Sequence, residues 1–146
     1  MRLSLFIPGD PVAQPRQKFT YRGGRVRGYT PKGHRIFKWR KILAAALERV
    51  APEQMPQGNV VVTLEFNFAR PKAHYGTGRN SDVLKPKAPD AHTQKPDLDN
   101  LAKPVMDEMT IAGWLRDDSQ VDELSASKYW CVSSETPGVE IEMCYD

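Results

Sequence analysis

Four stretches of the chain alternate apolar and polar residues, and a period of two predicts β-strands. The longest alternation covers 59–70, where one side carries Val60, Val62, Leu64, Phe66 and Phe68. Shorter alternations cover 2–7 and 138–146. The fourth stretch, 117–134, is expected to form a strand with Leu124, Ala126 and Trp130 on one face. Because only the turn-forming segment "SETPG" joins the last two stretches, we expect them to be neighbouring strands.

Two other stretches repeat their apolar residues every three to four positions, which predicts helices. The first covers 34–50 and has an apolar stripe of Ile36, Trp39, Leu43, Ala46, Leu47 and Val50. We expect this stripe to pack on the sheet, with Trp39 in the core. The second helix covers 100–113 and has a stripe of Leu101, Val105, Met106 and Met109. Gly113 is expected to end this helix. Pro104 falls early in it, and a helix tolerates a missing backbone N–H only near its first turn.

The order of these elements predicts an α/β (α+β) fold, with a small mixed β-sheet of about four strands flanked by two main helices. The 146 residues suit a single domain that covers 1–146. The sequence has no apolar run long enough to span a membrane, and its N-terminus lacks the apolar region of a signal peptide. We therefore expect a cytoplasmic protein whose Cys131 and Cys144 stay free thiols.

Two segments have no regular period. Residues 11–33 form a basic arm in which cations alternate with Phe19, Tyr21 and Tyr29, and we expect an extended arm or an open hairpin. Its aromatic rings can stack on bases while its cations hold phosphates. Residues 71–95 form a flexible loop rich in Pro, Gly and Lys, which is expected to fold over bound substrate. The loop carries His74 and His92, to which the sequence assigns no role.

Charge is distributed unevenly along the chain, although the net charge is only +3. Between residues 16 and 41 there are ten Lys and Arg and no acid, whereas residues 97–123 carry eight acids against two basic residues. A basic segment attracts phosphates, and an acidic cluster repels them unless it holds cations. Together the two segments indicate a protein that grips a polyanion and performs metal-assisted chemistry on it. For the basic segment alone, ordinary charge scatter is a competitive explanation.

The segment "KPDLDN" places Asp97 and Asp99 directly after Pro96. Residues two apart point to the same side of an extended chain, and a proline biases the residue before it towards extended geometry. We therefore expect both carboxylates to project together where the chain enters the second helix. The alternative is structural, because one of them could simply cap the helix N-terminus. On this segment alone the structural alternative is the better supported.

More acids follow at informative spacings. Asp99, Lys103 and Asp107 line one face of the second helix, so the lysine could form a salt bridge or point at a scissile phosphate. Asp117 and Asp118 are adjacent, and such a pair is costly unless it is solvated or shares a cation. The chain is expected to return Asp118 to the first pair of aspartates. Clustered carboxylates without His or Cys suit Mg²⁺ or Mn²⁺ better than zinc.

At this point the residues carry a resemblance to a known family. "KPDLDNLAKPVMDEM" followed by "GWLRDDSQV" resembles the signature of the RusA family of Holliday junction resolvases, metal-dependent endonucleases of which many are encoded by phages. The opening "IPGDPVAQPRQKFT" and the lysine-rich loop also resemble family members, so the resemblance covers nearly the whole chain. The sequence departs from the family in its arm, which has "AQPRQK" where the family has "GRPR". The resemblance therefore supports the metal site more strongly than it supports phosphate contacts in the arm.

The resemblance implies a role for each matching residue. The metal ligands would be Asp97, Asp99 and Asp118, with Asp117 as a further candidate, and Lys103 would be needed for cleavage. Asp107 and Gln120 also fall on family positions, with secondary roles. The family acts as homodimers that introduce paired symmetric nicks into four-way DNA junctions.

The sequence thus predicts a Mg²⁺-dependent, structure-selective endodeoxyribonuclease acting on branched DNA. Arg16, Lys18, Arg25 and Arg27 are expected to hold the DNA backbone. Two alternatives stay open. One is a DNA- or RNA-binding module that cuts nothing, and the other is a metal-dependent nuclease acting on other branched DNA or on duplex DNA.

Overall fold

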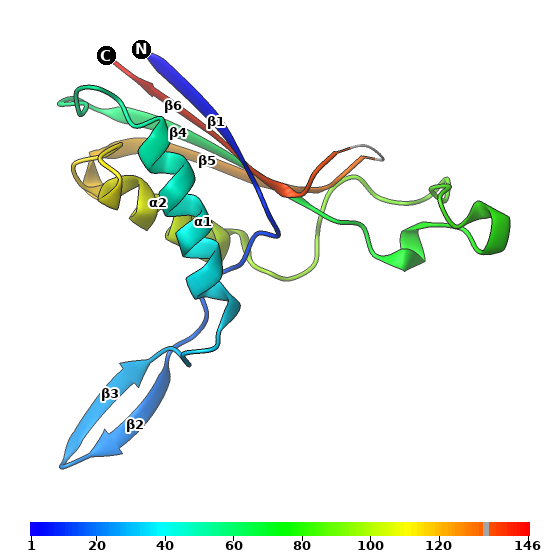
Figure 1. Ribbon diagram of the computed structural model, residues 1–146, viewed down its shortest axis with the longest axis horizontal. Helices are drawn as coiled ribbons and strands as arrows, with labels where there is room; N and C mark the ends of the chain where they lie inside the picture. The colour runs from blue at the N-terminus through cyan, green and yellow to red at the C-terminus, as the bar shows by residue number, and fades with distance from the viewer. Residues whose placement is uncertain (133–134) are drawn as a thin grey trace.

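The main body is built on a mixed β-sheet of four strands in the order β1-β6-β4-β5, as the computed structural model shows for residues 1–132 and 135–146 (Figure 1). The strands are β1 (Arg2–Pro8), β4 (Val60–Phe68), β5 (Val121–Trp130) and β6 (Gly138–Tyr145). β6 runs antiparallel to both β1 and β4, whereas β4 and β5 are parallel. The predicted fold class is confirmed.

The last two strands are not neighbours, so that expectation is wrong. β5 pairs with β4, while β6 lies on the other side of β4. The reason is burial: β4 is the most apolar strand and takes a central position, whereas β5 is largely polar and even its Leu124 is 48% exposed at the sheet edge. β5 is also shorter than the predicted 117–134, and residues 133–134 lie outside the described residues.

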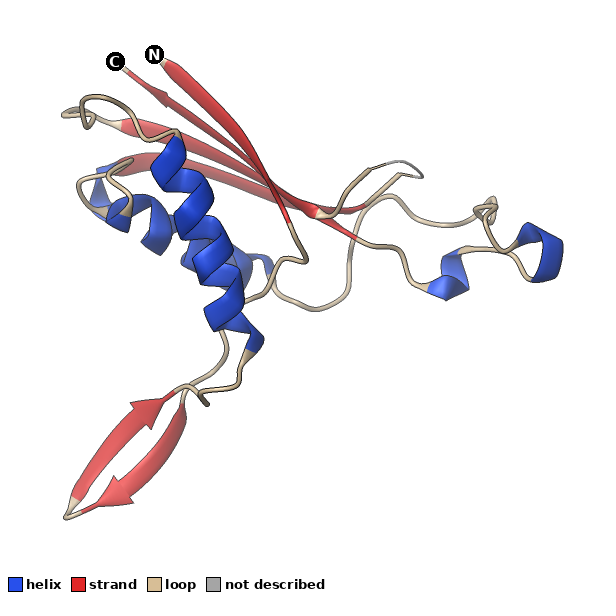
Figure 2. Ribbon diagram, viewed as in Figure 1, coloured by secondary structure: helices blue, strands red, loops and turns tan. Residues whose placement is uncertain are grey.

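Helices α1 (Arg35–Arg49) and α2 (Leu98–Ile111) both cover one face of the sheet (Figure 2). α1 buries the predicted stripe, including a Trp39 that is 2% exposed. Val50 was predicted to belong to this stripe, but it is the C-cap of α1 and 43% exposed because the helix ends one residue earlier. Within the described residues, each helix falls short of the length and apolarity that crossing a membrane requires.

The C-terminal end of α2 is fixed to α1. Gly113, with φ of 82°, donates its N–H to the Thr110 carbonyl at 3.2 Å, and the N–H of Trp114 reaches the Met109 carbonyl at 2.9 Å. These two bonds form a Schellman motif, which confirms Gly113 as the helix stop. The buried indole N–H of Trp114 then donates to the Leu47 carbonyl of α1 at 2.8 Å. This bond ties the two helices together at this end of the layer that they form.

The basic arm contains an antiparallel hairpin of β2 (Lys18–Arg22) and β3 (Arg25–Tyr29), which projects away from the body (Figure 1). We call this hairpin the ribbon. Its two-residue turn is Gly23-Gly24, with φ of 58° and 76°, as a type I′ turn requires. The open-hairpin alternative from the sequence is confirmed.

The loop over residues 71–95 also projects from the body, and it contains short 3₁₀ turns, η1 (Lys72–His74) and η2 (Gly78–Asn80). Arg70 precedes this loop, and its side chain, which is only 1% exposed, is hydrogen-bonded to the C-terminal part of the loop and to the end of the sheet. The guanidinium donates to the carbonyls of Cys131 and Pro89 at 2.6 and 2.7 Å and to the Asp90 carboxylate at 2.9 Å. The loop therefore leaves and rejoins the sheet at a fixed point.

Candidate active site and DNA-binding ribbon

The first pair of aspartates lies at the N-terminus of α2. Asp97 is the N-cap, with extended φ and ψ of −71° and 143°, but its side chain makes no capping hydrogen bond. Asp99 is the second helical residue, so the expectation that both carboxylates project from extended chain is wrong for Asp99: the helix begins at Leu98. Both carboxylates are exposed, and within the described part of the chain no hydrogen bond or ion pair engages either side chain. The capping alternative therefore does not account for them.

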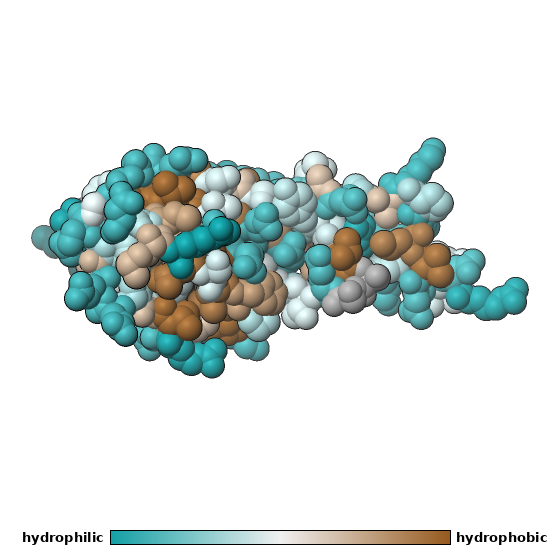
Figure 3. Space-filling model, turned by 90° about the horizontal axis from the view of Figure 1, so that it is seen from above, coloured by the Kyte–Doolittle hydropathy of each residue, from teal (hydrophilic) through white to brown (hydrophobic). Residues whose placement is uncertain are grey.

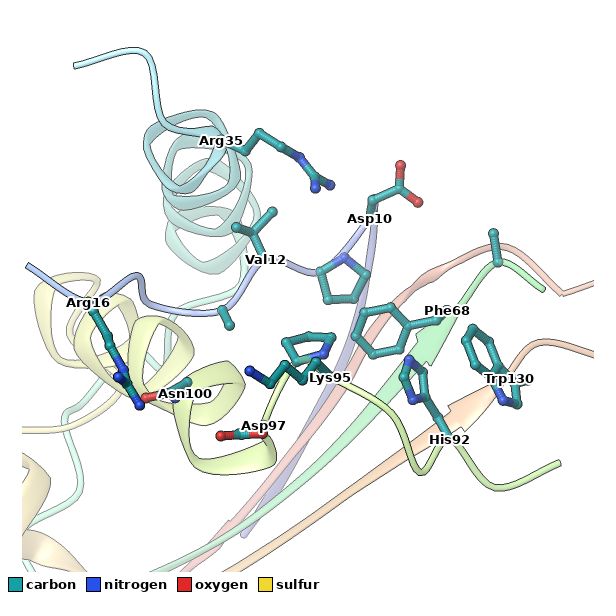
Figure 4. Close-up of a pocket in the computed structure, with 14 residues that line it drawn as sticks. Asp10, Val12, Arg16, Arg35, Phe68, His92, Lys95, Asp97, Asn100 and Trp130 are labelled. Atoms are coloured by element: carbon teal, nitrogen blue, oxygen red, sulfur yellow. The ribbon is translucent and has the colours of Figure 1, made fainter. Parts of the chain in front are cut away.

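Asp97 lines a cavity of about 710 Å³ between the ends of β4, α1 and α2. Three cations share this cavity with it, namely Arg16, Arg35 and Lys95. In Figure 4, Arg16 and Asn100 lie on one side of Asp97, and the rings of Phe68, His92 and Trp130 lie on the other. A carboxylate among cations, at the positively polarised end of a helix, is an environment that suits an anionic ligand and a metal ion together.

Lys128 holds the chain that leads into this site, and sequence reasoning missed it. Its ammonium group donates to the carbonyl of Pro96 at 2.6 Å and also to the carbonyl of Gln94. Lys128 lies on the same side of β5 as Ala126 and Trp130, which are partly or fully buried. The sequence did contain a signal for it, because Lys128 interrupts the alternating apolar positions Leu124, Ala126 and Trp130 of β5. Its contacts fix the backbone immediately before Asp97.

The aromatic wall of the cavity consists of Phe68, His92 and Trp130. The imidazole of His92 stacks on Trp130 with ring centroids 3.9 Å apart and meets the edge of Phe68 at 4.7 Å. His92 is 4% exposed, and burial together with the charge of Lys128 lowers its pKa. His74 also packs edge-on against Trp130, at 5.1 Å. Both histidines therefore have a packing role in this wall.

Lys103 forms a salt bridge in the same helix, one of the two alternatives that the sequence left open. Its ammonium group lies 3.1 Å from the Asp107 carboxylate, while the lysine side chain stays 60% exposed. Asp107 also pairs with Arg40 of α1 at 3.1 Å, and Arg40 reaches Glu108 at 3.2 Å. Asp107 therefore holds Lys103 and Arg40 together on the outer face of the helix layer.

Asp118 lies at the opposite end of α2. Its carboxylate accepts a hydrogen bond from the Thr110 hydroxyl at 2.9 Å, and Thr110 is thirteen residues beyond Asp97 along the helix. At a rise of 1.5 Å per residue this separation is about 20 Å. The expectation that the chain returns Asp118 to Asp97 and Asp99 is therefore wrong within one chain. Among the described residues, no three acidic, His or Cys side chains gather closely enough to hold a metal ion.

Asp117 and Gln120 have local structural roles. Asp117 caps the 3₁₀ turn η3 (Asp118–Gln120) by accepting the N–H of Ser119 at 2.8 Å. Hydrogen bonding by Ser119 lowers the pKa of the Asp117 carboxyl group. Gln120 is buried, and its amide donates to the carbonyls of Pro56 and Gly58 at 2.6 and 2.7 Å. Gln120 thus ties this turn to the segment before β4 and does not face the cavity at Asp97.

The two faces of the ribbon differ in chemistry. Directly opposed residues of an antiparallel pair share a face, and the register therefore sorts the side chains. One face carries Lys18, Thr20, Arg22, Arg25, Arg27 and Tyr29. The other carries Phe19, Tyr21 and Val26, which are 69%, 73% and 65% exposed. Three of the four predicted DNA-binding residues thus lie on one cationic face, while Arg16 lies at the ribbon base beside Asp97.

A second cavity lies at the end of the molecule that carries both chain termini. It has about 490 Å³ and is lined by Met1, Leu3, Met55 and Tyr145, among others. Figure 3 views this end and shows hydrophobic side chains framed by hydrophilic ones. Its lining contains no Lys or Arg, so it does not suit a polyanion. The candidate site is therefore the cavity at Asp97.

The chain is similar to a known protein family and to a bacterial relative. The family described as "Endodeoxyribonuclease RusA" matches residues 8–144. A relative named "Uncharacterized protein YqaN", from Bacillus subtilis (strain 168), is 35% identical over 140 residues, which covers 92% of this chain and 90% of the relative. The family match spans the ribbon, the cavity and both ends of α2.

Proposed function

Because this chain belongs to the RusA endodeoxyribonuclease family, we propose that it resolves four-way DNA junctions by Mg²⁺-dependent hydrolysis of phosphodiesters, giving paired symmetric nicks. The observation that carries the proposal is the pair of unengaged carboxylates, Asp97 and Asp99, at the N-terminus of α2. A DNA substrate would be met in the cytoplasm, as the sequence predicts.

The residues at this end of α2 fit a hard divalent cation. Mg²⁺ prefers oxygen ligands and is commonly held by one or two carboxylates together with water and substrate phosphates. Asp97 and Asp99 would hold it, and Mn²⁺ is expected to substitute. When bound, the ion supplies charge neutralisation at the phosphodiester and makes water a better nucleophile.

Two cations of the chain would act on the phosphate directly. Lys103 lies one helical turn beyond Asp99, and its exposed ammonium group would stabilise the negative charge that develops during hydrolysis. Arg16 lines the same cavity as Asp97 and would orient the phosphate for attack.

A homodimer would complete the metal site. Asp118 is about 20 Å from Asp97 within one chain, whereas in the proposed two-fold dimer Asp118 of the partner subunit would approach Asp97 and Asp99. Because a two-fold interface is reciprocal, one such contact implies a second identical one. Two equivalent sites would match the two nicks that junction resolution requires.

The ribbon would hold the junction arms. Its cationic face, with Lys18, Arg25 and Arg27, is suited to the DNA backbone. Its exposed aromatic face is suited to stacking on bases that a branch point leaves without neighbours. A two-stranded ribbon is also of a size that the major groove accepts.

The chief alternative is a DNA-binding module without nuclease activity. The observation that favours it is the absence of a three-carboxylate cluster within the described residues of one chain. Metal dependence of cleavage separates this alternative from the proposal.

The test is a cleavage assay on a synthetic four-way junction and on the matching linear duplex, with Mg²⁺ and with EDTA. We expect paired nicks in the junction alone, lost with EDTA and in Asp99→Asn. Junction binding by Asp99→Asn should be retained or improved, because a negative charge near the phosphates has been removed. Cleavage by Asp99→Asn at the wild-type rate would refute the metal assignment, and binding without cleavage under all conditions would support the alternative.

A further inference from the structure

The base of the ribbon is fastened to α2 through a backbone carbonyl. In an α-helix the carbonyl of residue i accepts the N–H of residue i+4, so the partner of Asn100 would be residue 104. That residue is Pro104, which has no N–H. The Gln14 N–H donates to the Asn100 carbonyl instead, at 2.7 Å. Pro104 lies in the second turn of α2, because the helix begins at Leu98 and not at Asn100 as the sequence predicted. The ribbon base supplies the donor that Pro104 lacks.

The side chain of Gln14 makes a second tie, to α1. Its carbonyl oxygen accepts a hydrogen bond from the Arg40 guanidinium at 2.8 Å. Arg40 also holds Asp107, which in turn holds Lys103. The half-buried Gln14 is thus joined to the start of α2 by its backbone and to the cleavage lysine through two ion pairs.

The ribbon has few other attachments. Within the described residues, no hydrogen bond or ion pair joins residues 18–29 to the body of the protein. The placement of the ribbon therefore depends on the segments at its two ends. Gln14 lies four residues before the first ribbon residue, Lys18, and its N–H is bonded to α2.

We propose that Gln14 is a positioning residue that fixes the ribbon relative to the N-terminus of α2 and so sets where the junction is cut. This inference rests on the proposed function. Phosphate contacts on the ribbon set the register of the DNA, and Asp97 and Asp99 determine which phosphodiester reacts. A rigid tie between the two converts the grip on the DNA into a defined cutting position, and a misplacement of about 1 Å can cost about 100-fold in rate.

The side-chain tie is tested with Gln14→Leu, which keeps the size of the residue but removes the acceptor for Arg40. The matched control is Gln17→Leu, since Gln17 is exposed, lies three residues further on and, among the described residues, forms no hydrogen bond with the body. The measurements are single-turnover cleavage at saturating junction, the positions of the cuts, junction affinity and the melting temperature.

For Gln14→Leu we expect cleavage to slow by about 10-fold or more and the cuts to spread over more positions. Affinity and melting temperature should stay close to those of Gln17→Leu, because the ribbon cations are intact. Spreading of the cuts is a change that a loss of stability alone would not produce. Identical rates and cut positions in the two variants would overturn the inference while leaving the nuclease function intact. If the wild-type protein itself did not cut the junction, the proposed function would fail and the inference with it.

The backbone tie is tested with Pro104→Ala, which restores an N–H that competes for the Asn100 carbonyl. We expect faster hydrogen exchange at the Gln14 amide, unchanged exchange in β4 and β6, and the same spreading of the cuts. Unchanged protection of the Gln14 amide would overturn the role given to Pro104.

Discussion

The Thr110 hydroxyl donates a hydrogen bond to the Asp118 carboxylate at 2.9 Å. This contact fixes Asp118 at the C-terminal end of α2, whereas Asp97 lies at the N-terminal end, where its side chain makes no capping hydrogen bond. Asp118 shares a cavity of about 370 Å³ with Asp117, Asp107 and Arg40. The carboxylates that the sequence predicts to form one acidic site therefore lie at two separate places on one chain.

If the two groups of carboxylates meet across a dimer interface, two inactive variants should restore each other. A mixed dimer of Asp99→Asn and Asp118→Asn subunits has one site with both defects and one with neither. After subunit exchange we expect single nicks in the junction, from about a quarter of the wild-type number of sites. The measurement is a strand-specific cleavage assay on the mixture and on each variant alone.

The same experiment has a clear negative outcome. If each chain held its own complete site, every subunit of the mixture would carry a defect and no cleavage would return. The control is a mixture of Asp97→Asn and Asp99→Asn, whose defects lie in the same half-site and cannot complement in either arrangement.

The cationic face of the ribbon makes a prediction about salt. On duplex DNA the logarithm of the binding constant falls with the logarithm of the salt concentration, and each phosphate contact adds about 0.9 to the magnitude of that slope. Replacing Arg27 by Ala should therefore weaken junction binding and lower that slope by about 1. Arg49→Ala is the matched control, because this exposed arginine lies at the far end of α1. An unchanged slope in Arg27→Ala would exclude Arg27 from the interface.

His92 makes a prediction about the pH dependence of stability. Its pKa is lowered from the ordinary value of 6.5, first by burial and then by the charge of Lys128. Below pH 6.5 the unfolded chain binds a proton at this histidine more readily than the folded protein does. The free energy of unfolding is therefore highest near neutral pH and falls as the pH drops below about 6.5. Urea unfolding between pH 5 and 8 should show this loss in the wild type and a smaller one in His92→Phe, which keeps the ring packed on Trp130. Equal losses in both proteins would show that His92 titrates normally.

The sequence by itself determined where most helices and strands lie, and it predicted which residues carry the chemistry. Alternation in 59–70 marked the central strand β4, and the helical stripe from Ile36 to Leu47 marked the face of α1 that packs on the sheet. Gly113 marked the end of α2, because the left-handed conformation there strongly favours glycine. The sequence also predicts that Asp97, Asp99 and Lys103 act together, since their spacing along the chain is local information.

Only the tertiary structure decided which distant residues meet. A period of two cannot say which strands pair, so the insertion of β4 between β5 and β6 was not visible in the sequence. The sequence likewise could not show that the length of α2 separates Asp118 from Asp97, or that Gln14 supplies the donor that Pro104 lacks. These contacts depend on how helices and strands pack in space, and packing is set by the whole chain at once and not by any local stretch of it.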